Sequence, residues 1–231
     1  MADICIFRNE KVLPEAFSFW DELTDNQKSL LCANTVRVEY KKKANIIGDL
    51  SAASESPGAL YVKSGSLRAY LLSEDGREVT LYRIFPGDVC VLACGCLMEN
   101  INFDIFVDAE TDTEVFSIRS GAFGSVISDN LNAENFALKV AASRLSDVIW
   151  TLEQILFMSF DKRLATFLVD EMSRTGENTI KLTHEQIAKY MSSAREVVSR
   201  MLKYFSEEGI VSLSRGGVTI IDKDRLRKLT Y

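Results

Sequence analysis

The sequence lacks any apolar run long enough to cross a bilayer, for which a helix needs about 20 consecutive apolar residues. Its first residues, 1–11, also lack the basic start and apolar middle of a secretory signal. Of the 231 residues, 47% are hydrophobic and 26% are charged, which is typical of a folded protein with room for two modest domains. We therefore expect a cytoplasmic protein with no membrane partner.

Histidine is nearly absent and cysteine is present in an odd number. The five cysteines occur in a chain with no export signal, so we interpret them as reduced thiols and not as a disulfide framework. The one histidine, His184, disfavours a metal-dependent β-barrel enzyme, whose sites usually use several histidines. A haem in the N-terminal part of the chain would need Cys, Met or Tyr as its axial ligand, because the one histidine lies in the C-terminal part, and this disfavours a haem. We expect no bound metal, no cofactor and no enzymatic activity.

The charge is distributed unevenly along the chain. The net charge of −6 argues against a protein that coats nucleic acid indiscriminately. Residues 1–180 hold 17 Lys and Arg against 27 Asp and Glu, whereas residues 181–231 hold 10 against 6, a balance of +4. Such asymmetry favours a polyanionic partner for the C-terminal end, although a solvated face would give the same count.

Residues 36–118 show the pattern of short strands. Apolar positions alternate on both sides of the turn residues 63–66, Glu74-Asp75-Gly76 predicts a hairpin, and "FPGD" at 85–88 predicts a further turn. Residues 14–32 predict one or two short helices before them. This spacing of strands indicates a sandwich or a small barrel, and we assign residues 1–130 to one domain.

Residues 131–158 predict one long helix, with no Pro or Gly inside it. A heptad seam about three heptads long runs along it, which favours a parallel homodimer. The seam consists of Leu138, Ala141, Leu145, Val148, Leu152 and Ile155. Packing against the chain's own domain is the alternative, and apolar positions off the seam indicate that part of the helix does so. These are Phe136, Val140, Ile149, Trp150 and Leu156.

Residues 159–231 predict helices followed by a β-hairpin. One amphipathic helix ends at Gly176, a short strand lies in "NTIKLT", and Thr183 with Gln186 has the spacing of a capping box that opens the next helix. A turn at 191–193 leads to another helix that ends before Gly209, and "IVSLSRGGVTII" predicts a hairpin. Helix, tight turn, helix and hairpin make a winged helix-turn-helix, whose second helix lies in the DNA major groove.

The second helix of this motif has an apolar and a polar side. Its buried side is predicted to contain Val197, Val198, Met201, Leu202 and Phe205. Facing outward are Ala194, Arg195, Glu196, Ser199, Arg200 and Lys203. Arginine can bind guanine O6 and N7, and glutamate can accept from cytosine N4. Alternatively, Glu196 caps the helix with Ser193 or forms a solvated ion pair with Arg200.

These segments resemble the Crp/Fnr family of bacterial transcription regulators. The resemblance is carried by "SFDKRLATFLVDE", "LTHEQIAKYMSSAREVVSRMLKYFSEEGIV" and "LSRGGVTIID", and upstream by "YVKSGSLRAYLLSEDGREVTLYRIFPGD". It implies an α+β fold with an N-terminal antiparallel β-roll that is jelly-roll-like and senses an effector. A long dimerisation helix and a C-terminal winged helix-turn-helix that binds double-stranded DNA follow it, and RNA polymerase is a further partner that the resemblance suggests.

The resemblance also implies roles for individual residues. Glu196, Ser199 and Arg200 match the E-x-x-S-R pattern of members that bind half-sites with a TGA core, which assigns them base contacts. Arg195 would contact a base or a phosphate. Thr183, Lys203 and Arg215 would lie near phosphates, which position a protein on DNA without specifying sequence. His184 is expected at the surface near the DNA.

The predicted sensor domain departs from members that bind cyclic nucleotides. Those members carry Gly-Glu and then Arg-Ser or Arg-Thr after the P-G-D turn. This chain has Val91-Leu92 and Phe103-Asp104 at about these places. Because an aspartate repels a phosphate, we expect an unknown small effector or a redox signal in place of cyclic AMP or GMP.

Cysteines near that turn are candidates for a redox sensor. Cys90, Cys94 and Cys96 share parity, so an extended strand would direct all three to one side. With Cys5 or Cys32 they could bind an iron–sulfur centre or a soft metal. Free cysteine is, however, among the most buried residue types, and ordinary core packing is the interpretation that we prefer.

An effector in the β-roll would change how the paired helices sit. This would set the spacing of two recognition helices, which must match major grooves about 34 Å apart on a palindrome. The alternative from another class is a cupin-like β-barrel enzyme or thiol redox protein whose C-terminal helices serve assembly. That alternative predicts turnover or a metal and no sequence-specific DNA binding.

Overall fold

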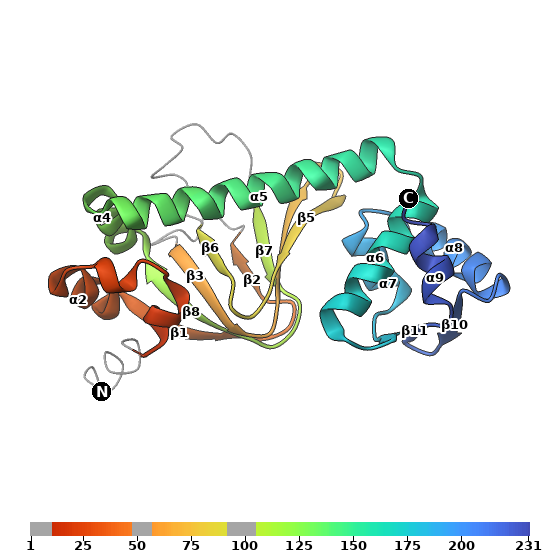
Figure 1. Ribbon diagram of the computed structural model, residues 1–231, viewed down its shortest axis with the longest axis horizontal. Coiled ribbons are helices and arrows are strands. Elements are labelled where there is room, and N and C mark those ends of the chain that lie inside the picture. Colours follow the sequence, from red (N-terminus) through yellow and green to blue (C-terminus); the bar gives the residue numbers. More distant parts are fainter. Residues whose placement is uncertain (1–10, 48–56, 92–104) are drawn as a thin grey trace. The chain divides into compact units, whose positions relative to one another are not determined.

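The computed structural model describes residues 11–47, 57–91 and 105–231 of the chain (Figure 1). The chain divides into two compact units, one made of Met1–Leu72 with Leu81–Val148 and the other of Ser73–Thr80 with Ile149–Tyr231. The division falls inside a single uninterrupted helix, α5 (Leu131–Phe157). No helix in the described ranges is long and apolar enough to cross a membrane.

Short helices open the first unit, as the sequence predicts. Residues 11–16 are helical, a 3₁₀ turn η1 (Trp20–Glu22) follows, and α2 covers Asp25–Ala33. Helix α2 begins where it does because Thr24 caps it: the Thr24 hydroxyl accepts from Gln27 N, and the Gln27 side chain accepts from Thr24 N. The apolar side chains of this region, Phe17 and Leu31 among them, are fully buried.

Two four-stranded antiparallel sheets form the body of the first unit and confirm the predicted roll. Their orders are β1-β8-β3-β6 and β2-β7-β4-β5. The strands are β1 (Thr35–Tyr40), β2 (Asn45–Ile47), β3 (Pro57–Ser64), β4 (Leu67–Leu72), β5 (Glu78–Ile84), β6 (Val89–Val91), β7 (Phe106–Ala109) and β8 (Thr113–Arg119). Since β4 and β5 are neighbours, the hairpin predicted at Glu74-Asp75-Gly76 is present.

One apolar cluster joins strands of both sheets, because β-strands place alternate side chains on one face. Leu60 and Val62 of β3, Leu67 and Ala69 of β4, and Cys90 of β6 belong to it. Cys90 is only 1% exposed there. The described cysteine of the predicted trio therefore packs in the core as a small apolar side chain.

Two helices follow the sheets. Helix α4 (Ser120–Asp129), which the sequence analysis did not predict, packs Phe123 and Val126 into a second cluster with the N-terminal helices. Helix α5 covers nearly all of the predicted segment 131–158 (Figure 1). Its first turns pack on this cluster through Ala133 and Ala137, with Phe136 and Val140 partly buried.

The rest of α5 is more exposed. The prediction that part of the helix packs on the chain's own domain through apolar positions off the seam is confirmed at Phe136 and Val140. Ile149, Trp150 and Leu156 are 55%, 47% and 67% exposed. They lie beyond the turns of α5 that contact the cluster, so the single chain has little to cover them.

The second unit has the predicted order of elements. These are α6 (Phe160–Thr175), β9 (Thr179–Ile180), α7 (His184–Tyr190), α8 (Arg195–Glu207), β10 (Val211–Ser214), β11 (Gly217–Ile220) and α9 (Lys223–Lys228). Gly176 ends α6 in the left-handed conformation, at φ 70°. Strands β10 and β11 form the hairpin and β9 joins β11, which makes a three-stranded sheet. The short α9, capped by Asp222, was not predicted.

Gly65, in the turn between β3 and β4, provides a test of this packing. At φ +84° an added Cβ would lie 2.4 Å from Thr113 Oγ1 and 2.5 Å from Asp112 O, whereas one at Gly87, at φ +93°, would have nothing within 4 Å. Both alanine variants bear the cost of a left-handed backbone, and Gly65→Ala adds a clash with backbone. We expect Gly65→Ala to lower the free energy of unfolding by about 1–3 kcal/mol more than Gly87→Ala does.

Urea unfolding of both variants, followed by circular dichroism, measures this difference. Equal losses of stability in Gly65→Ala and Gly87→Ala would contradict the close approach of the Gly65 turn to Asp112 and Thr113.

Candidate nucleic-acid interface

Helices α7 and α8 are joined by a tight turn that the backbone holds firmly. Thr183 caps α7 through its hydroxyl, which accepts from Gln186 N, as the capping box predicts. In the turn, Ser193 N donates to Ala188 O at 2.9 Å, and Ser192 adopts a left-handed φ of 50°. The turn therefore fixes the direction in which α8 leaves α7.

Arg163 of α6 stabilises the same turn from inside the unit. Its Nη2 donates to the carbonyl oxygen of Met191, the residue that ends α7. Burial lowers the pKa of the Arg163 guanidinium, although an arginine stays charged at neutral pH. The residue pattern alone predicts no role for Arg163, and the signal available was its place in "SFDKRLATFLVDE", a segment that carries the family resemblance.

Helix α8 has the two sides that its sequence predicts. Val198, Leu202 and Phe205 are fully buried in the core of the unit, and Val197 and Met201 are partly buried. Five of the six side chains expected to face outward are exposed, namely Ala194, Arg195, Glu196, Arg200 and Lys203. Ser199 is instead half-buried.

Neither alternative interpretation of Glu196 holds. The residue that caps α8 is Ala194 and not Ser193, and it makes no side-chain capping bond. Among the described residues, no ion pair or hydrogen bond of the Glu196, Arg195 or Arg200 side chain is present. Three charged groups in the first half of α8 are thus available to an external partner.

Ser199 contacts the other helix of the motif. Its Oγ lies 2.9 Å from Nδ1 of His184, the first residue of α7. His184, which the sequence predicts at the surface early in the helix, is half-buried. The Ser199 hydroxyl can still make a second hydrogen bond on its outer side, because a hydroxyl has one donor and two acceptor positions.

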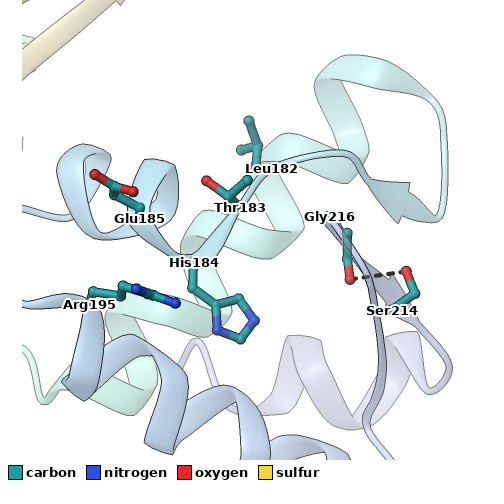
Figure 2. A pocket seen from close by; sticks show the side chains of 8 residues that line it. Leu182, Thr183, His184, Glu185, Arg195, Ser214 and Gly216 are labelled. Carbon is teal, nitrogen blue, oxygen red and sulfur yellow. Dashed lines mark hydrogen bonds between the residues drawn. The ribbon is translucent and has the colours of Figure 1, made fainter.

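The wing approaches the same place. Ser214 and Gly217 pair across the hairpin, so Arg215 and Gly216 form its two-residue turn, and Arg215 is exposed. A pocket of about 370 Å³ separates the wing from the helices and is lined by Leu182, Thr183, His184, Glu185, Arg195, Ser214, Gly216 and Gly217. Figure 2 shows Arg195 and His184 on one side of this pocket and Ser214 on the other.

Two of the residues expected near phosphates have contacts of their own. The Thr183 hydroxyl is engaged in the α7 cap, and Lys203 lies 3.7 Å from Glu207 in an ion pair whose side chains are 74% and 65% exposed. An exposed ion pair of this kind contributes little to stability and exchanges readily for another anion. The arrangement as a whole presents arginines, a carboxylate and a hydroxyl from one helix face, which suits hydrogen bonding to base edges.

The predicted sensor residues are described only in part. Cys5, Leu92, Cys94, Cys96, Phe103 and Asp104 lie outside the described residues. Cys32 is buried in the cluster around the N-terminal helices, whereas Cys90 belongs to the cluster between the sheets. No cluster of three or more His, Cys, Asp or Glu side chains suited to a metal occurs within the described ranges.

Comparisons with known proteins all point to one family of regulators. A family model described as "Crp-like helix-turn-helix domain" matches residues 162–229. A solved structure from Eubacterium rectale, assigned to transcriptional regulators of the Crp/Fnr family, is 42% identical, has a TM-score of 0.84, and the match covers 93% of this chain and 98% of that one.

Curated relatives are more distant. The anaerobic regulatory protein of Haemophilus influenzae is 25% identical over 209 residues, which are 84% of this chain and 77% of that protein. The cAMP-activated global transcriptional regulator CRP of Salmonella typhimurium is 26% identical over 189 residues, which are 79% of this chain and 87% of that protein. These relatives are transcription regulators and not enzymes, which agrees with the expectation of a regulator and disfavours the β-barrel enzyme.

Arg163 allows a test of how the turn is held. Arg163→Gln replaces the guanidinium that donates to Met191 O by a shorter side chain, and a partly buried carbonyl left unsatisfied costs about 1–3 kcal/mol. We expect faster amide hydrogen exchange in the turn and the start of α8, at residues 191–197, in this variant. Lys162→Gln, an exposed neighbour on the same helix, serves as the control. Unchanged exchange in Arg163→Gln would remove the role assigned to this side chain.

Proposed function

The chain belongs to the Crp/Fnr family of DNA-binding transcription regulators, and we propose that it binds as a homodimer to a palindrome with TGA-core half-sites. The observation that carries this proposal is the first half of α8, where Arg195, Glu196 and Arg200 are exposed and make no described side-chain contact. A stable fold gains little from leaving three such charges unpaired on one short stretch. A ligand with acceptors and donors in a fixed pattern accounts for them.

The proposed base contacts follow from the chemistry of these groups. Arg200 binds guanine O6 and N7, Glu196 accepts from cytosine N4, and Ser199 contacts a neighbouring base. Arg195, at the start of the helix, contacts a base or a phosphate. Together Glu196 and Arg200 suit the two bases of G·C pairs, in agreement with the G·C pair of a TGA core.

The proposed phosphate contacts surround these base contacts. Arg215 at the wing turn, Lys203 on the outer face of α8 and Thr183 at the start of α7 would position the protein on the duplex. A wing that carries an exposed arginine beside the pocket next to α8 is well placed for this role.

The proposed dimer rests on the exposed seam of α5. Leu138, Leu145, Leu152 and Ile155 are 49%, 60%, 50% and 37% exposed, and Ala141 and Val148 are half-buried between them. Large apolar side chains repeated at heptad spacing stabilise a helix only when a second helix covers them. The further exposed residues Ile149, Trp150 and Leu156 widen the apolar surface beyond the seam.

The proposed signal acts on the β-roll and is neither cyclic AMP nor cyclic GMP. Arg144 of α5 connects this helix to the roll, because its guanidinium lies 3.7 Å from Asp88 and 5.1 Å from the centre of the Tyr82 ring. Asp88 precedes β6, and Cys94 and Cys96 follow β6 in the sequence. A small effector or an oxidation near this strand would reach α5 through Arg144, and RNA polymerase would be the partner at a target promoter.

Arg200→Ala tests the assigned base contact. We expect loss of discrimination at one base pair of each half-site, on the order of 1–3 kcal/mol, because a bidentate arginine–guanine contact is lost. Fluorescence anisotropy with duplexes substituted one pair at a time, at constant salt, measures it. Arg227→Ala, which removes the same charge from α9, should weaken binding to all duplexes alike or not at all. Unchanged selectivity in Arg200→Ala would remove the assignment.

Leu145→Glu tests the dimer. A charge in the middle of the seam is costly to bury, so we expect this variant to sediment as a monomer at micromolar concentration while the wild type sediments as a dimer. Ser143→Glu adds the same charge on the outer face of the helix, two residues away, and should remain dimeric. A dimer that persists in Leu145→Glu would show that the seam is not the interface.

A further inference from the structure

The contact between His184 and Ser199 determines what Ser199 can offer to a base. The ring Nδ1 and the hydroxyl Oγ are 2.9 Å apart, and they join the first residue of α7 to the middle of α8. Both side chains are half-buried, so the contact lies where the interior of the unit meets the exposed face of α8. Ser199, on the recognition face of α8, is thereby hydrogen-bonded to an imidazole, a group that can change its protonation state.

Serine has a single hydroxyl hydrogen, and this limits its combinations of contacts. A neutral imidazole with an unprotonated Nδ1 accepts that hydrogen, which leaves Ser199 with lone pairs only. An imidazolium donates from both nitrogens, so Ser199 must then accept from His184, and its hydrogen is available to a base. The two states of the ring therefore give the same hydroxyl opposite roles.

We propose that His184 is a positioning residue that sets the hydrogen-bond polarity of Ser199, and with it the base preferred in the major groove. Cytosine presents an N4 donor there and guanine presents the acceptors O6 and N7. The neutral ring favours cytosine at the position that Ser199 contacts, and the protonated ring favours guanine. This inference rests on the proposed DNA recognition and adds to it a dependence of sequence preference on pH.

The surroundings of His184 contain few other groups that could produce the same effect. Glu185 of α7 and Arg195 of α8 are the charged side chains that line the same pocket, the wing contributes Ser214 and two glycines, and Arg215 adjoins them. Imidazole is the side chain that ordinarily changes charge between pH 5 and 8, whereas carboxyl and guanidinium groups ordinarily do so outside this interval. A change of base preference within that interval points to the ring.

The test measures a ratio of affinities. The position that Ser199 contacts is located first, as the base pair at which Ser199→Ala loses discrimination. Duplexes with C·G and with G·C at that position are then bound by the wild type at about pH 5.5 and about pH 8. Protonation also adds a charge near the phosphates, but this strengthens binding to both duplexes and cancels in the ratio.

We expect the wild-type ratio to shift toward guanine at the lower pH by roughly two- to tenfold, the effect of one hydrogen bond gained or lost. His184→Ala should show no shift, because its Ser199 hydroxyl is free to turn. A ratio independent of pH in the wild type, a shift that persists in His184→Ala, or a Ser199→Ala variant that alters no position would each overturn the inference. If the wild type fails to prefer the palindrome over a scrambled duplex, the proposed function fails, and this inference fails with it.

A second measurement needs no DNA. Because the chain has one histidine, the ring nitrogen-15 signals of the whole protein belong to His184. At the higher pH we expect an unprotonated Nδ1 and a proton on Nε2, and a changed Nδ1 shift in Ser199→Ala. A neutral ring protonated at Nδ1 would contradict the proposed polarity.

Discussion

Burial of the apolar side of α8 is the interaction on which the recognition surface depends. Val198, Leu202 and Phe205 are fully buried, and each such side chain contributes about 1.5–3 kcal/mol. The exposed Lys203–Glu207 pair on the same helix contributes less than about 1 kcal/mol. Apolar packing therefore decides which way α8 faces, and the polar residues are presented outward as a consequence. The turn at Ser192 and the bond from Arg163 to Met191 then fix the direction of the helix.

The same reasoning explains the long helix. The apolar side chains of its first turns pack against the cluster of the first unit, so these turns are stabilised within the single chain. Beyond them, Leu145 and Leu152 are at least half exposed at heptad spacing, and a single chain gains nothing from that arrangement. A partner helix would cover this apolar surface, and Arg144 of the same helix contacts the β-roll. In the proposed function, a signal in the roll would act on the paired helix through this contact.

Much of this architecture could be predicted from the sequence, because its signals are local and strong. Thr183 with Gln186 and Gly176 mark helix ends through their own backbone chemistry, and the 3-4 spacing in α8 identified the side that is buried. Helix α4 was missed because its sequence, "SGAFGSVISD", has glycines and no capping pattern, and it is helical owing to packing of Phe123 and Val126.

The misses at the site have a similar cause. The bond between His184 and Ser199 and the bond from Arg163 to Met191 join residues 15 and 28 positions apart. Periodicity reports which side of a helix is buried, but it does not report which side chain of another helix lies opposite. The sequence also did not show which off-seam positions of α5 pack on the first unit, because the apolar character of Ile149, Trp150 and Leu156 does not say whether the covering surface belongs to the same chain.

The central claim is that this chain recognises a DNA sequence, and one binding measurement tests it most directly. The fully reduced protein, with no ligand added, is titrated onto a palindromic duplex with TGA-core half-sites and onto a scrambled duplex of the same composition, at one moderate salt concentration. Matched salt is essential because phosphate contacts alone give strongly salt-dependent binding. The account predicts tighter binding to the palindrome, with two protein chains for each duplex. Equal affinity for the two duplexes, unaltered over the salt range in which both are bound, would contradict it.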